Sequence, residues 1–293
     1  MRIVMMEKKL PVLLIILCAV LFWGPVVAAA EELDIVNRPV NISGLTGLLI
    51  TTSPYTLAPG TVEIGASVLS DNSTKPDFTI TEYPFSATIG VSNSSEVALR
   101  SSFYSISEGP TGSSVVTRKT GEIELSYKWN FIPHSEASMR PAVAVIFTGL
   151  MPAEKNSDKD KKADSVSHWG MRLGLSVGTE LTWKEYLLGI YADGQLAGHD
   201  LTDTRLKDLY WIFNAGLLFP ISKYKNLQMF VEYSLVTGKD LITLGGGDYS
   251  ALTYGLRLVT ERFNLSMGSQ SVHNKIEGYD NSGRVIGLIS YKF

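Results

Sequence analysis

The chain has 293 residues, of which 45% are hydrophobic and 19% are charged, and its formal net charge is −3 at pH 7. This mild acidity argues against nucleic acid as a partner, because nucleic-acid-binding domains carry basic patches. Cys18 is the only cysteine, which excludes a disulfide within the chain and a cysteine-ligated metal site.

The N-terminal residues 1–30 have the pattern of a secretory signal peptide. A basic start precedes an apolar run over residues 10–22, and three alanines ending at Ala30 supply the small residues of a cleavage site. We therefore predict cleavage after Ala30. Since Cys18 lies in this signal, the mature chain is expected to lack cysteine.

The remaining chain divides into two segments. Prolines and glycines interrupt residues 31–60, which are predicted to form a periplasmic lead-in or a plug segment. From Thr61 onward, apolar residues alternate with polar ones, the period of a β-strand with two different faces. Residues 61–293 are therefore predicted to form a single barrel domain.

About twelve alternating stretches follow one another, each near the length of about ten residues with which a tilted strand crosses a bilayer. No run of about 18 apolar residues follows residue 30, so no membrane-spanning helix is expected. In chain order, the apolar positions of these stretches span residues 62–68, 85–91, 97–103, 123–129, 143–147, 169–177, 186–190, 211–219, 227–235, 252–258, 263–267 and 285–293.

The predicted connections alternate between short and long. This alternation is typical of an outer-membrane barrel, with tight periplasmic turns and longer outer loops. An open sheet edge in hydrocarbon would leave backbone groups unpaired, so the sheet must close. The sequence thus predicts an all-β fold, a closed antiparallel transmembrane β-barrel in the bacterial outer membrane, with both termini periplasmic. The longer connections are expected near residues 71–79, 107–119, 152–166, 197–209, 239–249 and 273–282.

Aromatic residues fall near the ends of the predicted strands, where amphipathic rings favour the two membrane interfaces. Trp169 and Trp211 are expected near the outer interface. Trp129, Phe131, Phe219, Phe263 and Tyr291 are expected near the periplasmic interface.

The last residues alternate in the same way, with Ile289, Tyr291 and the terminal Phe293 on one face. This pattern resembles the signal that the bacterial barrel-assembly machinery recognises. The resemblance implies that machinery as a partner. Outer-membrane lipid is the partner expected for the apolar outer face of the barrel.

A second resemblance covers residues 44–65. Gly44–Pro54, followed by Pro59–Gly65, is similar to the first segment of YjbH-type barrels, which are associated with exopolysaccharide secretion. It implies polysaccharide export as an alternative function.

Charged residues on the polar faces are the candidates for function. They could line a channel that selects solutes by charge, or they could form a salt-bridge network that stabilises a narrow barrel. A barrel of about twelve strands lies between small barrels filled by side chains and wide aqueous pores. We predict a channel or transporter for small hydrophilic solutes, which residues 31–60 could block. The lumen-lining candidates are Glu63, Arg100, Glu122, Glu124, Lys128, Arg172, Asp193, Glu232 and Arg257.

Two other classes of function stay open. A lipid hydrolase would need a nucleophile beside a base such as His168 or His199, but the sequence has no clear catalytic pattern, so we expect no enzyme, no cofactor and no metal. An adhesin would use its outer loops to bind a surface partner. The charged run Glu154–Lys162 and the glycines before Asp248 are most simply explained as solvated, flexible loops.

Overall fold

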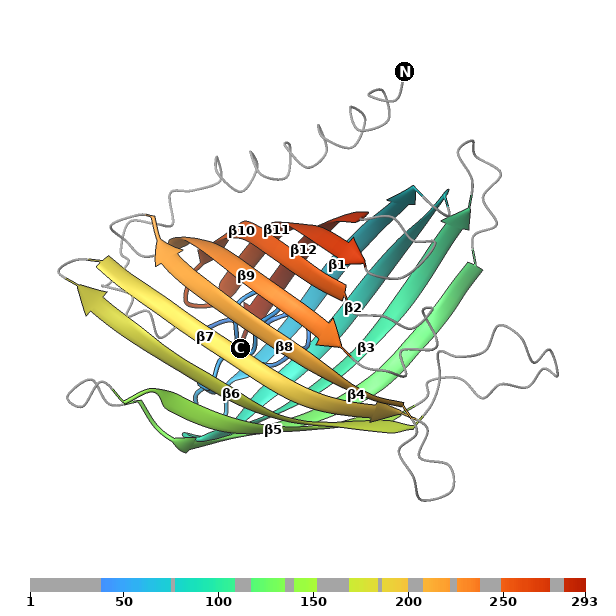
Figure 1. Cartoon of the computed structure of the whole chain (residues 1–293). Coiled ribbons are helices and arrows are strands. Elements are labelled where there is room, and N and C mark those ends of the chain that lie inside the picture. Colours follow the sequence, from blue (N-terminus) through green and yellow to red (C-terminus); the bar gives the residue numbers. More distant parts are fainter. Residues whose placement is uncertain are drawn as a thin grey trace. The chain divides into compact units, whose positions relative to one another are not determined.

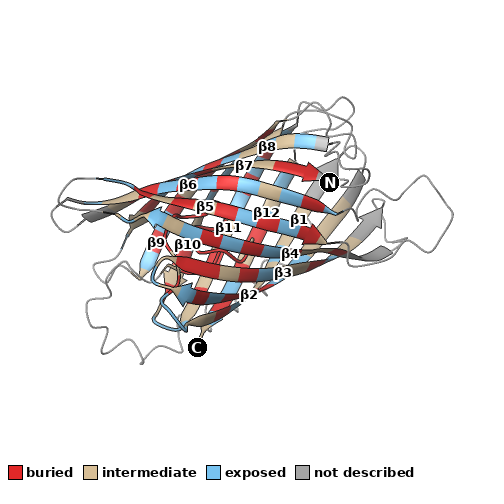
Figure 2. Cartoon of the chain, turned by 90° about the horizontal axis from the view of Figure 1, so that it is seen from below, coloured by how far each residue is buried: buried red, intermediate tan, exposed pale blue. Residues whose placement is uncertain are grey.

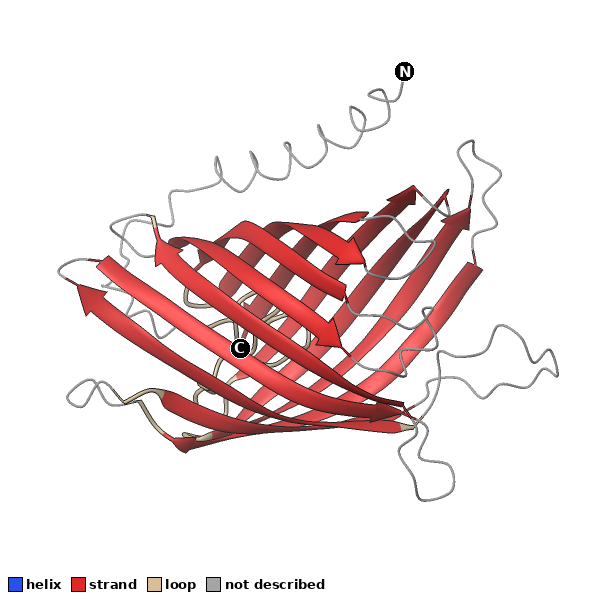
Figure 3. Ribbon diagram, in the orientation of Figure 1, coloured by secondary structure: helices blue, strands red, loops and turns tan. Residues whose placement is uncertain are grey.

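The chain folds into a single closed barrel of twelve strands in the computed structural model, in which β1 pairs with β12 (Figure 1). Every strand is antiparallel to both neighbours, and Figure 3 shows that strands make up the wall. The predicted closed antiparallel barrel is confirmed. The structure describes residues 38–74, 77–108, 117–134, 140–151, 169–183, 186–199, 208–221, 226–237, 249–274 and 282–293.

The strands are β1 (Val62–Thr74), β2 (Asp77–Ser92), β3 (Ser95–Glu108), β4 (Thr117–Ile132), β5 (Ala142–Met151), β6 (Gly170–Trp183), β7 (Tyr186–His199), β8 (Asp208–Pro220), β9 (Leu227–Thr237), β10 (Tyr249–Val259), β11 (Phe263–Asn274) and β12 (Ser282–Lys292). Within the described residues, no helix is long and apolar enough to cross a membrane. The predicted signal peptide lies outside the described residues.

Buried and exposed residues alternate along the strands (Figure 2). Large apolar side chains point outward from every strand except β11, whose apolar outward residues are half-buried. Leu175 is 53% exposed and Phe147 is 50% exposed, for example. Apolar surface exposed in this way would be unfavourable in water by about 25 cal/mol per Å². Hydrocarbon is therefore the solvent that suits the outer face.

We call the end of the barrel that carries Phe293 and the two-residue turn Asn93–Ser94 the turn end, and the opposite end the loop end. The structure corrects one expected connection. A longer loop was predicted over residues 71–79, but β1 and β2 stay paired up to Thr74 and Asp77. The ladder continues because backbone hydrogen bonds do not require apolar side chains. The loops predicted over residues 152–166 and 239–249 lie largely outside the described residues.

The aromatic residues predicted at the turn end differ in exposure. Trp129 and Phe131 are exposed on β4, with ring centroids 5.9 Å apart, and Tyr291 contacts Phe293 edge-on at 4.8 Å. Phe219 and Phe263 are half-buried. At the loop end, Trp169 and Trp211 are exposed.

We call residues 38–60 the plug; residues 38–57 lie inside the barrel, where they appear as the blue loops of Figure 1, and residues 58–60 are exposed. Two isolated bridges, between Val40 and Thr46 and between Gly47 and Thr52, fold the plug back on itself. Gly44 has a φ of 84°, and a Cβ there would lie 2.9 Å from the Cβ of Ser86. Glycine therefore permits both the left-handed turn and the close approach to the wall.

The hydrophobic core lies between the plug and the wall, inside the lumen. Leu48 and Leu49 of the plug are 2% and 0% exposed and pack in one cluster with Leu218, Phe230 and Leu288 of the wall. These inward apolar residues interrupt the otherwise polar faces of their strands. They supply the apolar surface on which an irregular segment can dock.

Candidate functional site

Glu232, in the middle of β9, holds the central loop of the plug. Its carboxylate is fully buried and accepts hydrogen bonds from three consecutive backbone N–H groups, those of Leu49, Ile50 and Thr51. The shortest, from Thr51, is 2.6 Å long. Successive N–H groups that point to one place form an anion-binding concavity, so here the wall supplies the anion and the plug supplies the donors.

Glu63 and Asp193 each bind one plug amide. Glu63 of β1 accepts from the N–H of Val40 at 3.1 Å, and Asp193 of β7 accepts from the N–H of Thr52 at 2.8 Å. Asp193 also accepts from the side-chain amide of Asn214 at 3.0 Å. The plug backbone is thus hydrogen-bonded to opposite sides of the barrel, which satisfies donors that an irregular buried segment cannot pair internally.

Lys128 and Glu96 form an ion pair that is 0% exposed, with 2.9 Å between Nζ and Oε1. Glu96 accepts from the N–H groups of Thr46 and Leu57, each at 2.9 Å. Lys128 donates to the carbonyl oxygens of Thr46 and Ser53, at 3.2 and 2.9 Å. Both charges are paired and also hydrogen-bonded to the plug, the arrangement in which a buried ion pair is tolerated.

The guanidinium of Arg257, on β10, also reaches the plug and donates to the carbonyl oxygen of Gly47 at 3.0 Å. Arg257 and Glu232 both face inward from neighbouring strands, as predicted. The register, however, places Glu232 opposite Thr253 and Arg257 opposite Gln228. Arg257 donates to the side chain of Gln228.

Where the described chain begins, Arg38 fixes the plug to β6. Its Nε and Nη2 atoms donate to the two carboxylate oxygens of Glu180, at 2.9 and 2.8 Å. The guanidinium also stacks on the ring of Tyr55, 3.5 Å from its centroid. Burial and the negative charge of Glu180 raise the pKa of Tyr55, so the ring under the guanidinium is neutral.

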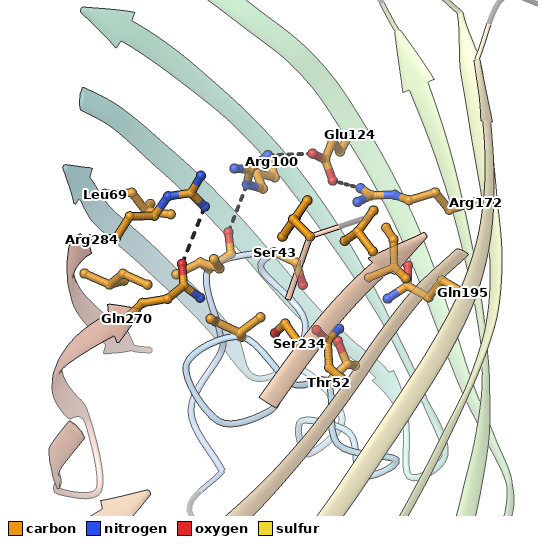
Figure 4. A pocket seen from close by; sticks show the side chains of 17 residues that line it. Ser43, Thr52, Leu69, Arg100, Glu124, Arg172, Gln195, Ser234, Gln270 and Arg284 are labelled. Atoms are coloured by element: carbon orange, nitrogen blue, oxygen red, sulfur yellow. Dashed lines mark hydrogen bonds and ion pairs between the residues drawn. The ribbon is translucent and has the colours of Figure 1, made fainter. Parts of the chain in front are cut away.

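A second group of charges lies on the loop-end side of the plug (Figure 4). Glu124 accepts from Arg100 and from Arg172, and Arg100 also donates to Glu82. These side chains come from β2, β3, β4 and β6. The Nε of Arg100 donates to the carbonyl oxygen of Ile42 at 2.9 Å, which links this network to the plug.

A cavity of about 200 Å³ lies between this network and the opposite wall. Its floor is the plug, through Ile42, Ser43, Ile50 and Thr52. Arg284 of β12 faces the cavity from the other side and donates to Asp71 through Nε at 2.8 Å. The cavity is therefore bordered by charged side chains of the wall and by residues of the plug.

Eight of the nine predicted lumen residues fall into two groups in the structure. One group contacts the plug and the other belongs to the network on the loop-end side. Glu122 is half-buried on β4. The first group is Glu63, Lys128, Asp193, Glu232 and Arg257, and the second is Arg100, Glu124 and Arg172.

Sequence reasoning missed several important partners. Glu96 lies on the same strand face as Arg100, four residues away, so strand periodicity could have identified it. Glu180 could have been identified in the same way, because it lies on the same face of β6 as Arg172. Arg38 had no such signal, because it lies in an irregular segment 142 residues away from its partner. Within the part of the chain that the structure describes, no three His, Cys, Asp or Glu side chains are grouped to hold a metal ion.

The comparisons with known proteins find similarity in fold and none in sequence. No protein-family model matches the chain, and no curated protein matches its sequence. An outer membrane channel from Pseudomonas putida F1 is similar with a TM-score of 0.60 and 11% identity, over 82% of this chain and 98% of that one. The chain has the fold of a bacterial outer-membrane β-barrel.

Other barrels align over similar lengths. LpxR from Salmonella typhimurium has a TM-score of 0.52 and 11% identity, over 79% of this chain and 99% of that one. The β domain of the Bordetella autotransporter BrkA has a TM-score of 0.50 and 8% identity, over 80% and 100%. Likeness at these identities concerns the fold, and function must be argued from the site.

Proposed function

We propose that this barrel is an outer-membrane channel for small hydrophilic solutes, closed by the plug in the state described above. The observation that carries the proposal is the chemistry of the plug contacts. Inward carboxylates and basic side chains from seven strands (β1, β3, β4, β6, β7, β9 and β10) hold the plug through hydrogen bonds. A wall with this composition can be hydrated once the plug moves away.

The plug contacts are mainly polar, so water can take their place when the plug is displaced. A hydrogen bond to a charged group contributes about 1.5–3 kcal/mol net, because water replaces the partner. The apolar contribution comes from two clusters, one around Leu48 and Leu49 and a second in which Leu45 packs against Ala98 and Ile146. The ladder hydrogen bonds of the barrel do not depend on the plug, so the plug can leave while the wall stays closed.

The first test is conductance in a planar lipid bilayer. A variant that lacks residues 38–60 is expected to conduct steadily, whereas the full chain conducts only in brief openings. Heat-modifiable migration on a denaturing gel checks that the shortened barrel is folded. A folded barrel without residues 38–60 that does not conduct would refute the channel proposal.

A disulfide lock provides the complementary test. A Cβ at Gly216 would lie 2.4 Å from a terminal methyl of Leu48, so these two positions are neighbours and we choose the pair Leu48→Cys/Gly216→Cys to link the plug to β8. We expect the oxidised variant to show no openings and a reductant to restore them. Each single cysteine variant is the matched control and should respond to neither treatment.

Charge selectivity tests the role of the lumen residues. In the barrel without the plug, Arg172→Gln leaves Glu124 with one fewer cation and should shift ion preference toward cations. Reversal potentials in a salt gradient measure the shift, and Arg140→Gln at the exposed turn end is the control.

The proposed orientation places the turn end toward the periplasm. It is tested by introducing a cysteine at one end of the barrel or the other and labelling that cysteine on whole cells.

The other predicted roles lack a comparable observation. His168 and the side chain of His199, the candidate bases of a lipid hydrolase, lie outside the described part of the structure. Of the other two histidines, His134 contacts the carbonyl oxygen of Arg140 and His273 is exposed on β11. Polysaccharide export, suggested by residues 44–65, and adhesion by outer loops stay predictions.

A further inference from the structure

The cavity above the plug contains an excess of positive charge among the residues that line it. Three of its lining residues are arginines, Arg100, Arg172 and Arg284, and one is an acid, Glu124. Asp71 and Glu82 balance the arginines from outside the lining. The surface that a solute touches is therefore cationic, and its counter-charges lie behind it.

The three arginines differ in how many of their guanidinium donors have acceptors within the protein. Arg100 donates through Nε, Nη1 and Nη2 to protein acceptors and is 12% exposed, so it has a structural role. Arg172 donates through Nη2 to Glu124, while its buried Nε has no partner. Arg284 contacts Asp71 and, at 3.5 Å, Gln270, and its side chain is 32% exposed. Arg172 and Arg284 thus retain donor capacity on opposite walls.

A second observation is independent of the arginines. Ser234 of β9 lines the same cavity, is 6% exposed, and its hydroxyl oxygen has no hydrogen-bond partner. Buried hydroxyls in proteins are mostly paired, so the unpaired hydroxyl of Ser234 in the cavity wall is available to a solute. The side chains of Gln195 and Gln270 border the cavity as neutral hydrogen-bonding groups (Figure 4).

We propose that this cavity is a binding site for a small oxyanion that also carries hydroxyl groups, of which a hydroxy-carboxylate is the simplest. Arg172 and Arg284 would attract the anionic group, which one of them would bind directly, and Ser234 would pair with a hydroxyl. A cavity of 150 Å³ accommodates benzene, so about 200 Å³ accommodates about eight non-hydrogen atoms. The part of the solute that lies inside the cavity would then have the size of an acid of three or four carbons. This proposal names the class of solute that the proposed channel would carry, and in that respect it rests on the proposed function.

Isothermal titration calorimetry on the purified full chain tests the site directly. We expect D-glycerate to bind and glycerol, its neutral analogue, to give no heat of binding. Glycerol 3-phosphate distinguishes a phosphate from a carboxylate as the anionic group, and binding of either acid supports the proposal. Equal binding of glycerate and glycerol, or binding of inorganic phosphate alone, would overturn it.

Substitutions test whether the named residues bind glycerate. Arg172→Gln and Arg284→Gln should each weaken glycerate binding by about tenfold or more, the effect of losing a charge-assisted hydrogen bond. Ser234→Ala should weaken it by about threefold to tenfold, and Arg140→Gln should leave it unchanged. An unchanged affinity in both arginine variants, with a folded barrel, overturns the assignment.

Conductance separates this proposal from the proposed function. A barrel without residues 38–60 that conducts, while the full chain binds none of the oxyanions, removes the binding site and leaves the channel intact. If the full chain binds glycerate but the shortened barrel never conducts, the binding site stands and the channel proposal fails.

Discussion

The buried ion pair between Lys128 and Glu96 offers the sharpest test of how the plug is held. Replacing Lys128 by Met removes one partner and leaves the Glu96 carboxylate uncompensated in a site that is 0% exposed. Removing one partner of a buried pair destabilises a protein by about 3–5 kcal/mol. Because Glu96 binds the amides of Thr46 and Leu57, we expect this loss to favour undocking of the plug.

Hydrogen–deuterium exchange measures that undocking, because it reports local opening without global unfolding. A loss of about 3–5 kcal/mol corresponds to an increase of about two to three and a half orders of magnitude in the opening constant. Peptides covering residues 38–57 should therefore exchange faster by that factor in Lys128→Met. Peptides from β10 to β12 should change little, since the barrel ladder stays closed.

Two further variants serve as controls. Lys128→Met/Glu96→Gln removes both charges and should exchange more slowly than Lys128→Met alone, because no unpaired charge stays buried. Lys292→Met removes a looser partner, 4.0 Å from Glu63 and 20% exposed, and should change exchange by less than about threefold. Plug exchange that is unchanged in Lys128→Met, or equally fast in the double variant, would refute this account of docking.

Three more substitutions test other parts of the plug contact. Glu232→Gln leaves one acceptor oxygen for three amides, and about 2–4 kcal/mol of lost docking should appear as faster exchange and more frequent channel openings. Arg38→Ala removes a bidentate ion pair and a cation–π contact, and about 2 kcal/mol of lost docking should accelerate chymotryptic cleavage within the plug. Gly90→Ala places a Cβ 2.1 Å from the carbonyl oxygen of Ala58 and should weaken docking there by about 1–3 kcal/mol, measured by exchange of residues 57–62. Its control, Gly149→Ala, meets no atom within 4 Å and should behave like the unaltered chain.

The lumen residues show what the period-two pattern of a strand can predict and what it cannot. Strand parity correctly predicts that Arg100, Glu124 and Arg172 face inward, because side chains alternate strictly between the two faces of a sheet. It does not predict their pairing. Arg172 on β6 reaches Glu124 on β4 across the intervening strand β5, and this contact depends on register and on the curvature of the closed barrel.

The sequence alone determines the barrel, because period-two alternation repeated along the chain leaves a closed antiparallel sheet as the arrangement that gives apolar faces to lipid and pairs every strand edge. The path of residues 38–60 is decided only by the tertiary structure. An irregular segment has no repeating pattern, and its backbone donors find acceptors as distant in sequence as Glu232, 183 residues beyond Leu49. Those carboxylates converge only when the sheet closes, so the site they form exists in the folded barrel and in no local stretch of the chain.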